Sequence, residues 1–322
     1  MNEFDIIREV FGQQGLTRGD VVVGIGDDAA VLRVPAAMEL VVSSDTLIAD
    51  VHFPAATDPA AIGYKALAVN LSDLAAMGAL PAWFTLNLSI PQSDPKWLAD
   101  FARGLFNLAR VHNVQLIGGD TTRGPLSISI QVHGFVPSGQ ALLRSGAKPG
   151  DQIYVSGTLG DAGLGLRLLQ QKLTLSTEYR SLVLNKLNYP LPRIELGLAL
   201  RTIASACIDV SDGLTADLRH ILEASQVGAR IALAQLPLSA AYRASQAQVG
   251  WDTALGHGDD YELCFTVPGQ KQQIFERMLP VSCGVTPIGT ILAGAELEIV
   301  DTTGQYYRPQ MAGYDHFVPN CD

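Results

Sequence analysis

The sequence predicts a mixed α/β (α+β) protein of two domains. Its 322 residues exceed what one hydrophobic core usually serves, because domains average roughly 150 residues. Apolar residues make up 48% of the chain, which is enough for two cores. Short apolar runs that end in Gly, Ser or Asp alternate with segments of helical pattern, and no short-period repeat is present. We therefore expect mixed sheets with packed helices in each half, with a first domain over 1–148 and a second over 149–322.

The expected elements of the first half follow from turn residues and periodicity. Apolar runs at 21–23, 40–42 and 114–117 predict strands, and alternation of apolar and polar residues over 126–136 predicts a half-buried strand. Asp58 and Asp94 each precede a proline, which indicates helix starts, so helices are expected over 59–77 and from 95 to about 112. The N-terminus carries acids and apolar residues at helical spacing. It is unlike a signal peptide, so we expect an amphipathic helix there and a cytoplasmic protein.

The second half is expected to begin after the turn at 147–151, which precedes a strand at 153–155. Glycines between 157 and 165 open a helix, and Ser211-Asp212-Gly213 opens another that runs to about Ala224. Further strands are expected at 230–233, 261–267 and 285–291. This half therefore alternates strands and helices.

Composition excludes several classes of function. Acidic residues outnumber Lys and Arg by 32 to 22 without a basic cluster, which argues against nucleic acid or an anionic membrane as a partner. The most apolar long stretch, 60–88, is interrupted by Lys65, Asp73 and Pro81, so no membrane-spanning segment is expected. The four cysteines form no CxxC pair, and we expect reduced, buried thiols rather than a zinc site or disulfides.

Aspartates recur at the ends of the apolar segments. They occur at Asp27-Asp28, Asp45, Asp73, Asp120, Asp209, Asp212 and Asp259-Asp260. Carboxylates gathered in one cleft repel each other unless cations lie among them, which points to hard divalent metals such as Mg²⁺. Because Mg²⁺ commonly bridges a few carboxylates to substrate phosphates, the pattern predicts an enzyme that handles phosphate.

Each of these acids also has a structural interpretation. Asp28, Asp45 or Asp120 taken singly would more often form an Asx turn. Asp73 lies on an apolar helix, where an inward carboxylate is costly unless it binds metal or pairs with a neighbour such as Lys65. The number of acidic turns favours metal binding for the set, though not for every member.

The sequence contains neither of the two common phosphate-binding loops, the dinucleotide-binding loop and the P-loop. Gly24-Ile25-Gly26-Asp27-Asp28-Ala29 fits the GxGxxA pattern, but two aspartates would stand where a pyrophosphate must approach, and the required helix does not follow. No GxxxxGK[ST] motif is present. Metals, backbone N–H groups and isolated basic residues must hold the phosphates. The segment 118–124 combines glycines, Asp120, hydroxyls and Arg123, and is either part of such a site or a glycine-rich hairpin connection.

Further candidates in the second half keep two interpretations each. Arg144 could reach phosphate oxygens or lie on the surface, and Ser211 could contact an anion at a helix start or act as the N-cap. The segment 256–263 could recognise a cationic, nitrogen-rich substrate through its carboxylates, or form a solvated turn. The aromatic tail 313–317 could close over a ring or pack.

Taken in order, these segments resemble the thiamine-monophosphate kinase family of the aminoimidazole ribonucleotide synthetase superfamily. The similar segments are Gly24–Asp28, Ser44–Leu47 with His52-Phe53, Lys65–Gly78, Gly118–Thr121, Asp209–Leu214 and Asp260–Leu263. They span nearly the whole chain. Related families share the general aspartate layout but not this full set.

The resemblance implies ATP-dependent phosphorylation of thiamine monophosphate to thiamine diphosphate, on a two-domain PurM-like fold that dimerises through strands of an ATP- and Mg²⁺-binding N-terminal domain. By motif position it implies Mg²⁺ ligands at Asp28, Ser43, Ser44, Asp45, Asp73, Asp120 and Asp209, with Asp212 holding a further ion. It implies ATP contacts at Gly119, Asp120, Arg144 and Ser211, and thiamine monophosphate contacts at His52, Asp259 and Phe317. No general base is expected, because the acceptor phosphate oxygen is already anionic near neutral pH. Several Mg²⁺ ions would bring the two polyanions together for in-line transfer.

Departures from the family pattern leave alternatives open. Ala29 and Ser44 stand where Cys and Thr are frequent, and Asp259 replaces the usual Glu, so Asp259, Asp260 or Glu262 could contact the substrate. Other members of the superfamily remain possible, such as aminoimidazole ribonucleotide synthetase or selenophosphate synthetase. The latter generally uses a reactive Cys near its N-terminus, whereas the first Cys here is Cys207. An alternative of another class is a non-catalytic nucleotide and Mg²⁺ sensor.

Overall fold

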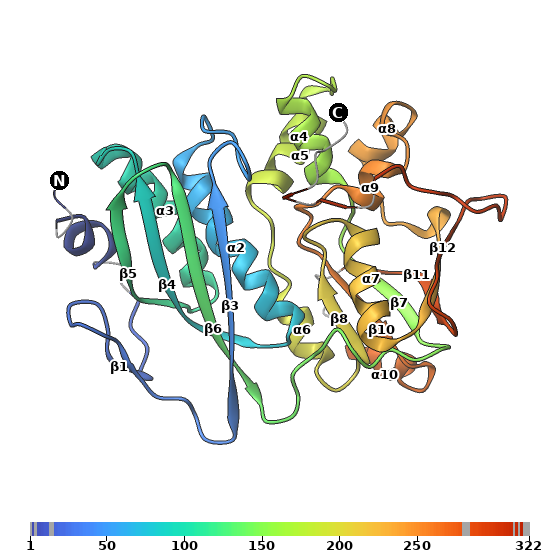
Figure 1. Cartoon of the computed structure of the whole chain (residues 1–322), viewed down its shortest axis with the longest axis horizontal. Helices are drawn as coiled ribbons and strands as arrows, with labels where there is room; N and C mark the ends of the chain where they lie inside the picture. Colours follow the sequence, from blue (N-terminus) through green and yellow to red (C-terminus); the bar gives the residue numbers. More distant parts are fainter. Residues whose placement is uncertain are drawn as a thin grey trace. The chain divides into compact units, whose positions relative to one another are not determined.

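The computed structural model describes residues 2, 5–12, 16–278, 284–311, 313–314 and 316–317. The chain forms two compact units (Figure 1): unit 1 comprises Met1–Leu74 and Ala79–Gln140, and unit 2 comprises Ala75–Gly78 and Ala141–Asp322. Each unit has a mixed sheet with helices, as the sequence predicts. The expected division after residue 148, with ATP binding and dimerisation assigned to the first part, stays a prediction.

Unit 1 contains a four-stranded sheet with helices packed on one face (Figure 1). Its elements are η1 (Ile6–Phe11), β1 (Val21–Val23), β2 (Val31–Leu32), β3 (Met38–Ile48), α2 (Pro59–Ala76), β4 (Leu80–Ile90), α3 (Pro95–Val111), β5 (Gln115–Arg123) and β6 (Ser127–Pro137). The sheet order is β3-β6-β4-β5, in which only β4 and β5 pair in parallel, and β1 and β2 form a separate pair. The expected N-terminal helix is described over 5–12, where η1 is a π-helical turn.

The two long helices of unit 1 begin where the Asp-Pro pairs predict. Asp94 Oδ1 accepts hydrogen bonds from the N–H groups of Lys96 and Trp97, and Asp58 Oδ1 accepts one from Ala60 N–H at 2.8 Å. The two helices pack closely at Gly104, which has no Cβ. A Cβ there would overlap the main-chain carbonyl of Ala60. Leucines of α2 and α3 therefore fill a continuous core under the sheet.

Unit 2 contains a six-stranded sheet of order β12-β9-β11-β7-β10-β8, antiparallel except for the pair β12 and β9. Its elements are β7 (Gln152–Ser156), α4 (Asp161–Leu169), α5 (Thr177–Asn188), α6 (Ile194–Leu200), β8 (Ala206–Asp209), α7 (Leu214–Ser225), β9 (Gly228–Ala232), η2 (Leu233–Gln235), α8 (Ala240–Val249), α9 (Asp252–Gly256), β10 (Leu263–Val267), η3 (Gly269–Lys271), α10 (Gln272–Met278), β11 (Val285–Leu292) and β12 (Leu297–Val300). The expected strands and helices of this half are all present within a few residues. Cys207 and Cys264 are buried free thiols, as expected, whereas Cys283 and Cys321 lie outside the described residues.

The segment Ala75–Gly78, which ends α2, belongs to unit 2. A Cβ at Gly197 of α6 would overlap the Ala75 carbonyl, and Arg201 Nε donates a hydrogen bond of 2.5 Å to the Gly78 carbonyl. Leu142 N–H donates to the Met77 carbonyl at 3.1 Å. This short segment therefore takes part in the internal packing of unit 2.

Two expected turns are wrong. Asp45 lies within β3 and Asp120 lies within β5, whereas the sequence pattern placed both after strands. β3 pairs with β6 along its whole length, from Met38 opposite Pro137 to Ile48 opposite Ser127. Pairing with a neighbouring strand outweighs the weak strand preference of Ser and Asp. The acids are therefore presented from strands, where successive side chains point to opposite faces.

Among the described residues, no helix is long and apolar enough to cross a membrane.

Candidate active site

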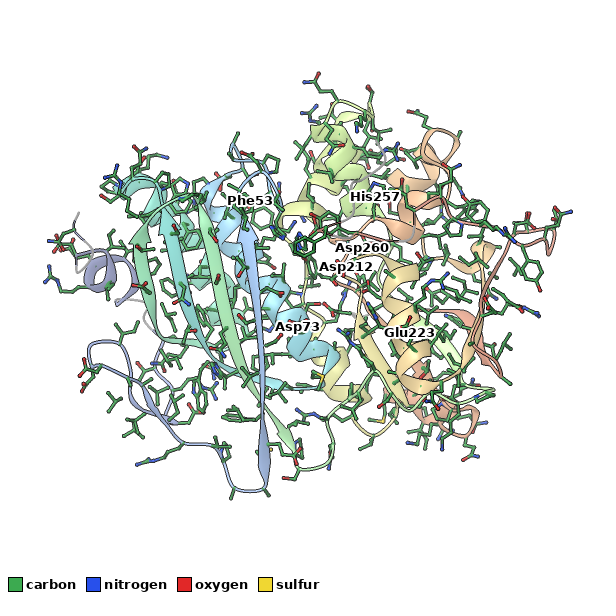
Figure 2. All side chains as sticks on the ribbon, in the orientation of Figure 1. Phe53, Asp73, Asp212, Glu223, His257 and Asp260 are labelled. Atoms are coloured by element: carbon green, nitrogen blue, oxygen red, sulfur yellow. The ribbon has the colours of Figure 1, made fainter. Side chains whose placement is uncertain are left out.

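One polar group in unit 1 lies between β3 and α2. Ser43 Oγ donates a hydrogen bond of 2.5 Å to Asp73 Oδ2, and Asp45 N–H donates to Asn70 Oδ1 at 3.0 Å. Figure 2 labels Asp73 on α2. Because side chains alternate along a strand, Ser43 and Asp45 share the face that α2 covers, and Ser44 lies on the opposite face. The structure thus brings Ser43, Asp45 and Asp73 together, and it separates Ser44 from them.

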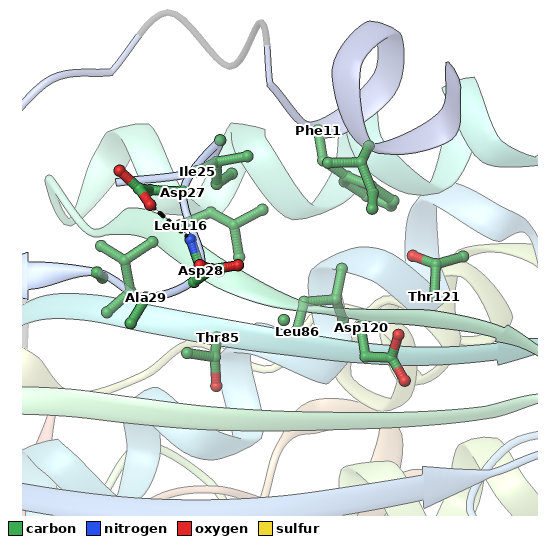
Figure 3. Close-up of a pocket in the computed structure, with 16 residues that line it drawn as sticks. Phe11, Ile25, Asp27, Asp28, Ala29, Thr85, Leu86, Leu116, Asp120 and Thr121 are labelled. Atoms are coloured by element: carbon green, nitrogen blue, oxygen red, sulfur yellow. Dashed lines mark hydrogen bonds between the residues drawn. The ribbon is translucent and has the colours of Figure 1, made fainter. Parts of the chain in front are cut away.

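A second group in unit 1 surrounds a pocket of about 620 Å³ (Figure 3). The pocket lies between the segment 25–30 and β5, with Asp27 and Asp28 at one end and Asp120 and Thr121 at the other. Asp28 N–H donates to Asp27 Oδ1 at 2.9 Å. The carboxylate-bearing residues Asp28 and Asp120 are exposed. The structure thus brings Asp28, Gly119 and Asp120 to one pocket, as the expected metal and nucleotide roles require.

Gly119 gives this pocket an open main chain. Its φ of +145° is rarely adopted by other residues, and a Cβ there would overlap the Leu86 carbonyl. The opposite part of the lining is apolar and includes Ile7, Phe11 and Ile25. Phe11 is fixed by edge-on packing against Phe101 and Phe106 of α3, with ring centroids 6.5 and 6.4 Å away. This apolar lining could not be predicted from the sequence, because η1 reaches the pocket only in the folded unit.

His52 lies in the turn after β3. The ring Nδ1 of His52 accepts a hydrogen bond of 3.0 Å from the main-chain N–H of Ile48. The main-chain N–H of His52 donates to the Ile48 carbonyl at 2.9 Å. An accepting Nδ1 places the proton of the neutral ring on Nε2. His52 can therefore act as a hydrogen-bond donor through Nε2.

In unit 2, the buried Asp209 is the last residue of β8, and Asp212 lies in the loop between β8 and α7. Asp217 accepts hydrogen bonds of 3.1 Å from the N–H groups of both Asp212 and Gly213. The helix N-cap is Gly213, so the alternative that Ser211 caps α7 is wrong. The pKa of Asp217 is raised to about 7, because burial and the neighbouring Asp212 carboxylate outweigh the opposing effect of the two N–H donors. Asp217 was missed at the sequence level, because a single acid in a helical turn carries no signal.

Charged groups surround Asp212 in unit 2. Burial raises the pKa of Asp212, and the Asp259 carboxylate adds to this shift, whereas His220, His316 and Arg144 oppose it. Arg144 and Asp259 therefore lie within electrostatic range of this loop. Figure 2 shows Asp212 with Asp260 and His257 of the neighbouring loop. The structure thus brings together Arg144, Asp212 and Asp259, three of the expected site residues.

The C-terminal aromatics approach the same loop. Tyr314 N–H donates to the Asp212 carbonyl at 3.0 Å, and the His316 ring packs edge-on against Tyr314 and Phe317, with ring centroids 4.9 and 6.5 Å away. The Phe317 side chain is 97% exposed. An exposed phenyl ring beside charged loops is available to a ligand.

The three acids near residue 260 have distinct environments. Glu262 is 2% exposed, and its carboxylate accepts hydrogen bonds from Arg193 and Ser156. Asp260 is partly exposed like Asp259, but burial raises the pKa of its carboxyl group, which accepts a hydrogen bond of 2.7 Å from Gly160 N–H. Asp259 is partly exposed, and its carboxylate accepts a hydrogen bond from the Tyr261 hydroxyl. Asp259 is therefore the acid of this segment best placed to meet a ligand.

The expected metal ligands form no preassembled cage. Within the described ranges, no group of three or more His, Cys, Asp or Glu side chains could hold a metal ion. Mg²⁺ is usually bound by one or two carboxylates together with substrate phosphates and water. Asp28 and Asp120 line one pocket, and Ser43 contacts Asp73, so ions that also bind substrate phosphate would draw on one or two of these groups each, and the Mg²⁺ assignment stays a prediction.

Comparison with known proteins covers both units. Residues 26–136 match the AIR synthase related protein, N-terminal domain, and residues 148–302 match the AIR synthase related protein, C-terminal domain. The chain is 48% identical over 323 residues to thiamine-monophosphate kinase of Escherichia coli K12, with 98% of each chain covered. The chain belongs to the thiamine-monophosphate kinase family. It is 34% identical to the Bacillus subtilis member, over 98% of this chain and 100% of that relative.

Solved structures of the family share the fold. Thiamine-monophosphate kinase from Stenotrophomonas maltophilia K279a has a TM-score of 0.86 and 46% identity, with 94% of this chain and 97% of that chain covered. The complex of AaThiL with AMPPCP and TMP has a TM-score of 0.78 and 28% identity, with 98% and 96% covered. The expected two-domain fold is confirmed by these members of the family.

Proposed function

We propose that this chain transfers the γ-phosphoryl group of ATP to thiamine monophosphate, which yields thiamine diphosphate and ADP. The observation that carries the proposal is the 48% identity to a thiamine-monophosphate kinase over 98% of both chains. A structural relative at 28% identity binds AMPPCP and TMP. The same reaction is what the resemblance of the sequence segments implies.

The pocket of unit 1 is the proposed nucleotide site. Its apolar lining of Ile7, Phe11 and Ile25 suits the flat face of a base, and the open main chain at Gly119 suits a phosphate. Asp120 shares this pocket. Arg144 and Ser211 of unit 2 are proposed as further ATP contacts, since Arg144 carries the positive charge that phosphate oxygens require.

Mg²⁺ is proposed as the cofactor, and when bound it would neutralise phosphate charge. The residues that would hold it are Asp28, Ser43, Ser44, Asp45, Asp73, Asp120, Asp209 and Asp212. The chain has a net charge of −10, so its own side chains supply too little positive charge for two polyanionic substrates. Carboxylates and hydroxyls are the oxygen ligands that this ion prefers.

The remaining chemistry is positioning. The acceptor oxygen of thiamine monophosphate is already anionic, so the proposal assigns no general base. The side chains bind and orient both substrates, which lowers the entropic cost of bringing them in line.

Three residues are proposed as contacts of thiamine monophosphate. The partly exposed Asp259 carboxylate offers a negative charge to the cationic substrate, and the exposed Phe317 ring offers a stacking surface. The Nε2–H of His52 offers a hydrogen bond to an oxygen of the substrate.

A homodimer is proposed from the edge of the unit 1 sheet. β3 is an end strand, and its residues Met38, Leu40 and Val42 are 37%, 44% and 46% exposed. Exposed apolar edge strands tend to pair with another chain. Sedimentation should give a dimer for the wild type and a monomer for Leu40→Lys with Val42→Lys, and a monomeric wild type would contradict this part. We place the enzyme in the cytoplasm, where ATP is available.

Release of ADP tests the function. The purified chain with ATP, Mg²⁺ and thiamine monophosphate should release ADP and form thiamine diphosphate, and unphosphorylated thiamine and other phosphorylated acceptors should give no such release. Chelation should abolish turnover, and added Mg²⁺ should restore it. Thermal stabilisation by ATP without ADP release would instead favour a nucleotide sensor.

A further inference from the structure

The loop that carries Asp259 has an unusual backbone. Asp259 and Tyr261 adopt left-handed conformations, with φ of +70° and +49°. Such values are uncommon for residues other than glycine, and for a bulky residue such as Tyr they are a source of strain. Strained backbone at a ligand site persists only where the surrounding structure holds it.

Backbone hydrogen bonds hold this loop against the β8–α7 loop. Asp259 N–H donates to the Ser211 carbonyl at 2.9 Å, and Tyr261 N–H donates to the Val210 carbonyl at 2.8 Å. Val210 N–H donates in return to the Glu262 carbonyl at 2.7 Å. A Cβ at Gly258 would overlap the Ser211 carbonyl, so the two main chains are in close contact. The path of residues 258–262 is therefore fixed from one side.

The buried Glu262 side chain also restrains the main chain of residues 258–262. Its Oε2 accepts hydrogen bonds from Arg193 Nε at 2.6 Å and Ser156 Oγ at 2.5 Å, and its Oε1 accepts one from Arg193 Nη2 at 2.5 Å. Ser156 Oγ also accepts from Leu263 N–H at 2.9 Å. A two-bond contact between guanidinium and carboxylate permits little rotation of either group. These contacts restrain the main chain on the C-terminal side of Tyr261.

The Tyr261 side chain is directed at Asp259. Tyr261 is 8% exposed, and its hydroxyl donates a hydrogen bond of 3.1 Å to Asp259 Oδ1. An aspartate in an exposed loop can rotate about two side-chain bonds, and a hydrogen bond from a rigid phenol selects one orientation. The left-handed backbone at both positions is what brings residues two apart in sequence into this contact.

We propose that Tyr261 is a positioning residue for the thiamine monophosphate site, and that its hydroxyl holds the Asp259 carboxylate in the orientation that meets the cationic part of the substrate. The inference rests on the proposed function and deepens it. Asp259 has a shorter side chain than glutamate and cannot adjust its reach, so a fixed orientation decides whether it contacts the substrate.

The test is steady-state kinetics of Tyr261→Phe, which removes one hydroxyl and keeps the ring. The KM for thiamine monophosphate should rise about tenfold, as expected when one hydrogen bond to a charged group is lost. The KM for ATP should change less than about twofold, because the hydroxyl that is removed contacts Asp259, which is proposed to bind thiamine monophosphate. Tyr154→Phe is the matched control, because Tyr154 is also 8% exposed and packs among the aromatic rings Phe265 and Phe275 of unit 2, away from this loop. It should leave both KM values unchanged.

A double-mutant cycle tests the positioning role of Tyr261 separately from the proposed function. If Tyr261 acts through Asp259, the double variant Asp259→Asn with Tyr261→Phe should have the same KM for thiamine monophosphate as Asp259→Asn alone. A wild-type KM in Tyr261→Phe alongside a raised KM in Asp259→Asn would overturn the positioning role and leave the substrate contact intact. Additive effects would also overturn it. A wild-type KM in Asp259→Asn would instead remove the proposed substrate contact, and absence of ADP release in the wild type would remove the function.

Discussion

The Ser43 hydroxyl donates a hydrogen bond of 2.5 Å to Asp73 Oδ2 and so joins β3 to α2. This hydrogen bond to Oδ2 limits the rotation of the Asp73 carboxylate. A carboxylate held in this way would need little reorganisation to bind a cation, which fits the metal-binding role proposed for Asp73. The contact also explains why an acid is tolerated on so apolar a helix.

Asp73→Asn should therefore affect turnover more than folding. We expect kcat to fall by about 100-fold or more, because a ligand charge that stabilises the transition state is lost while the side-chain volume is kept. The thermal midpoint should stay near that of the wild type. Asp100→Asn is the control, since Asp100 lies on α3 in a surface ion pair with Lys96 and Arg103. Wild-type turnover in Asp73→Asn would remove Asp73 from the proposed metal site.

Gly119→Ala should weaken nucleotide binding. The added methyl group would overlap the Leu86 carbonyl, and the φ of +145° is unfavourable for alanine. We expect the KM for ATP to rise and the thermal midpoint to fall. The neighbouring Gly118 has open space around its Cβ position, so Gly118→Ala should be close to wild type in both measurements. Equal effects of the two substitutions would contradict a close approach at Gly119.

The pH dependence of stability should change in Asp260→Asn. Burial raises the pKa of Asp260 above its usual range, with Asp161 and Glu262 adding to the shift. Because the folded state binds this proton more tightly than the unfolded state, the group favours folding at low pH, and this contribution is lost as the pH rises from the unfolded value toward the folded one. An asparagine can still accept from Gly160 N–H and carries no charge. The thermal midpoint of the variant, relative to that of the wild type, should rise between pH 5 and pH 8. If the two midpoints changed with pH in parallel, a buried neutral carboxyl would be contradicted.

The buried pair of Arg193 and Glu262 should show strong coupling. Arg193→Met leaves the Glu262 carboxylate buried without its two-bond partner and should cost about 3–5 kcal/mol of stability. The double variant Arg193→Met with Glu262→Met should cost less than the sum of the single changes, because neither charge remains unpaired. Denaturant unfolding followed by a probe in unit 2 measures this. Additive losses would mean that the two side chains contribute independently.

Local signals predicted the elements of the fold well where the decisive contacts are short-range. The starts of α2 and α3 follow from Asp58 and Asp94, each of which caps a helix two or three residues away. The expectation that Asp45 and Asp120 follow strands was wrong, because Asp45 pairs with Ile130 and Asp120 with Asn87, and no local pattern records such distant partners.

The candidate site also has residues that could be predicted from the sequence and partners that could not. Motif resemblance identified Asp28, Asp73 and Asp259 as candidates, but their partners depend on the folded chain. Arg193 reaches Glu262 across 69 residues, and η1 reaches a pocket that lies between the segment 25–30 and β5. Asp259, Asp260 and Glu262 are alike in sequence, and only the structure separates them: Glu262 is buried, and Asp259 and Asp260 have different hydrogen-bond partners.

The assignment of Ala75–Gly78 to unit 2 limits how this protein can be divided. A fragment that starts near residue 148 would lack the four residues that pack against Gly197 and hydrogen-bond Arg201 and Leu142. A fragment that ends there would carry those residues without the surface they pack on. Separating the halves near residue 148 would therefore remove this packing from unit 2, so a fragment of the second half should include residues 75–78 to keep its own contacts complete.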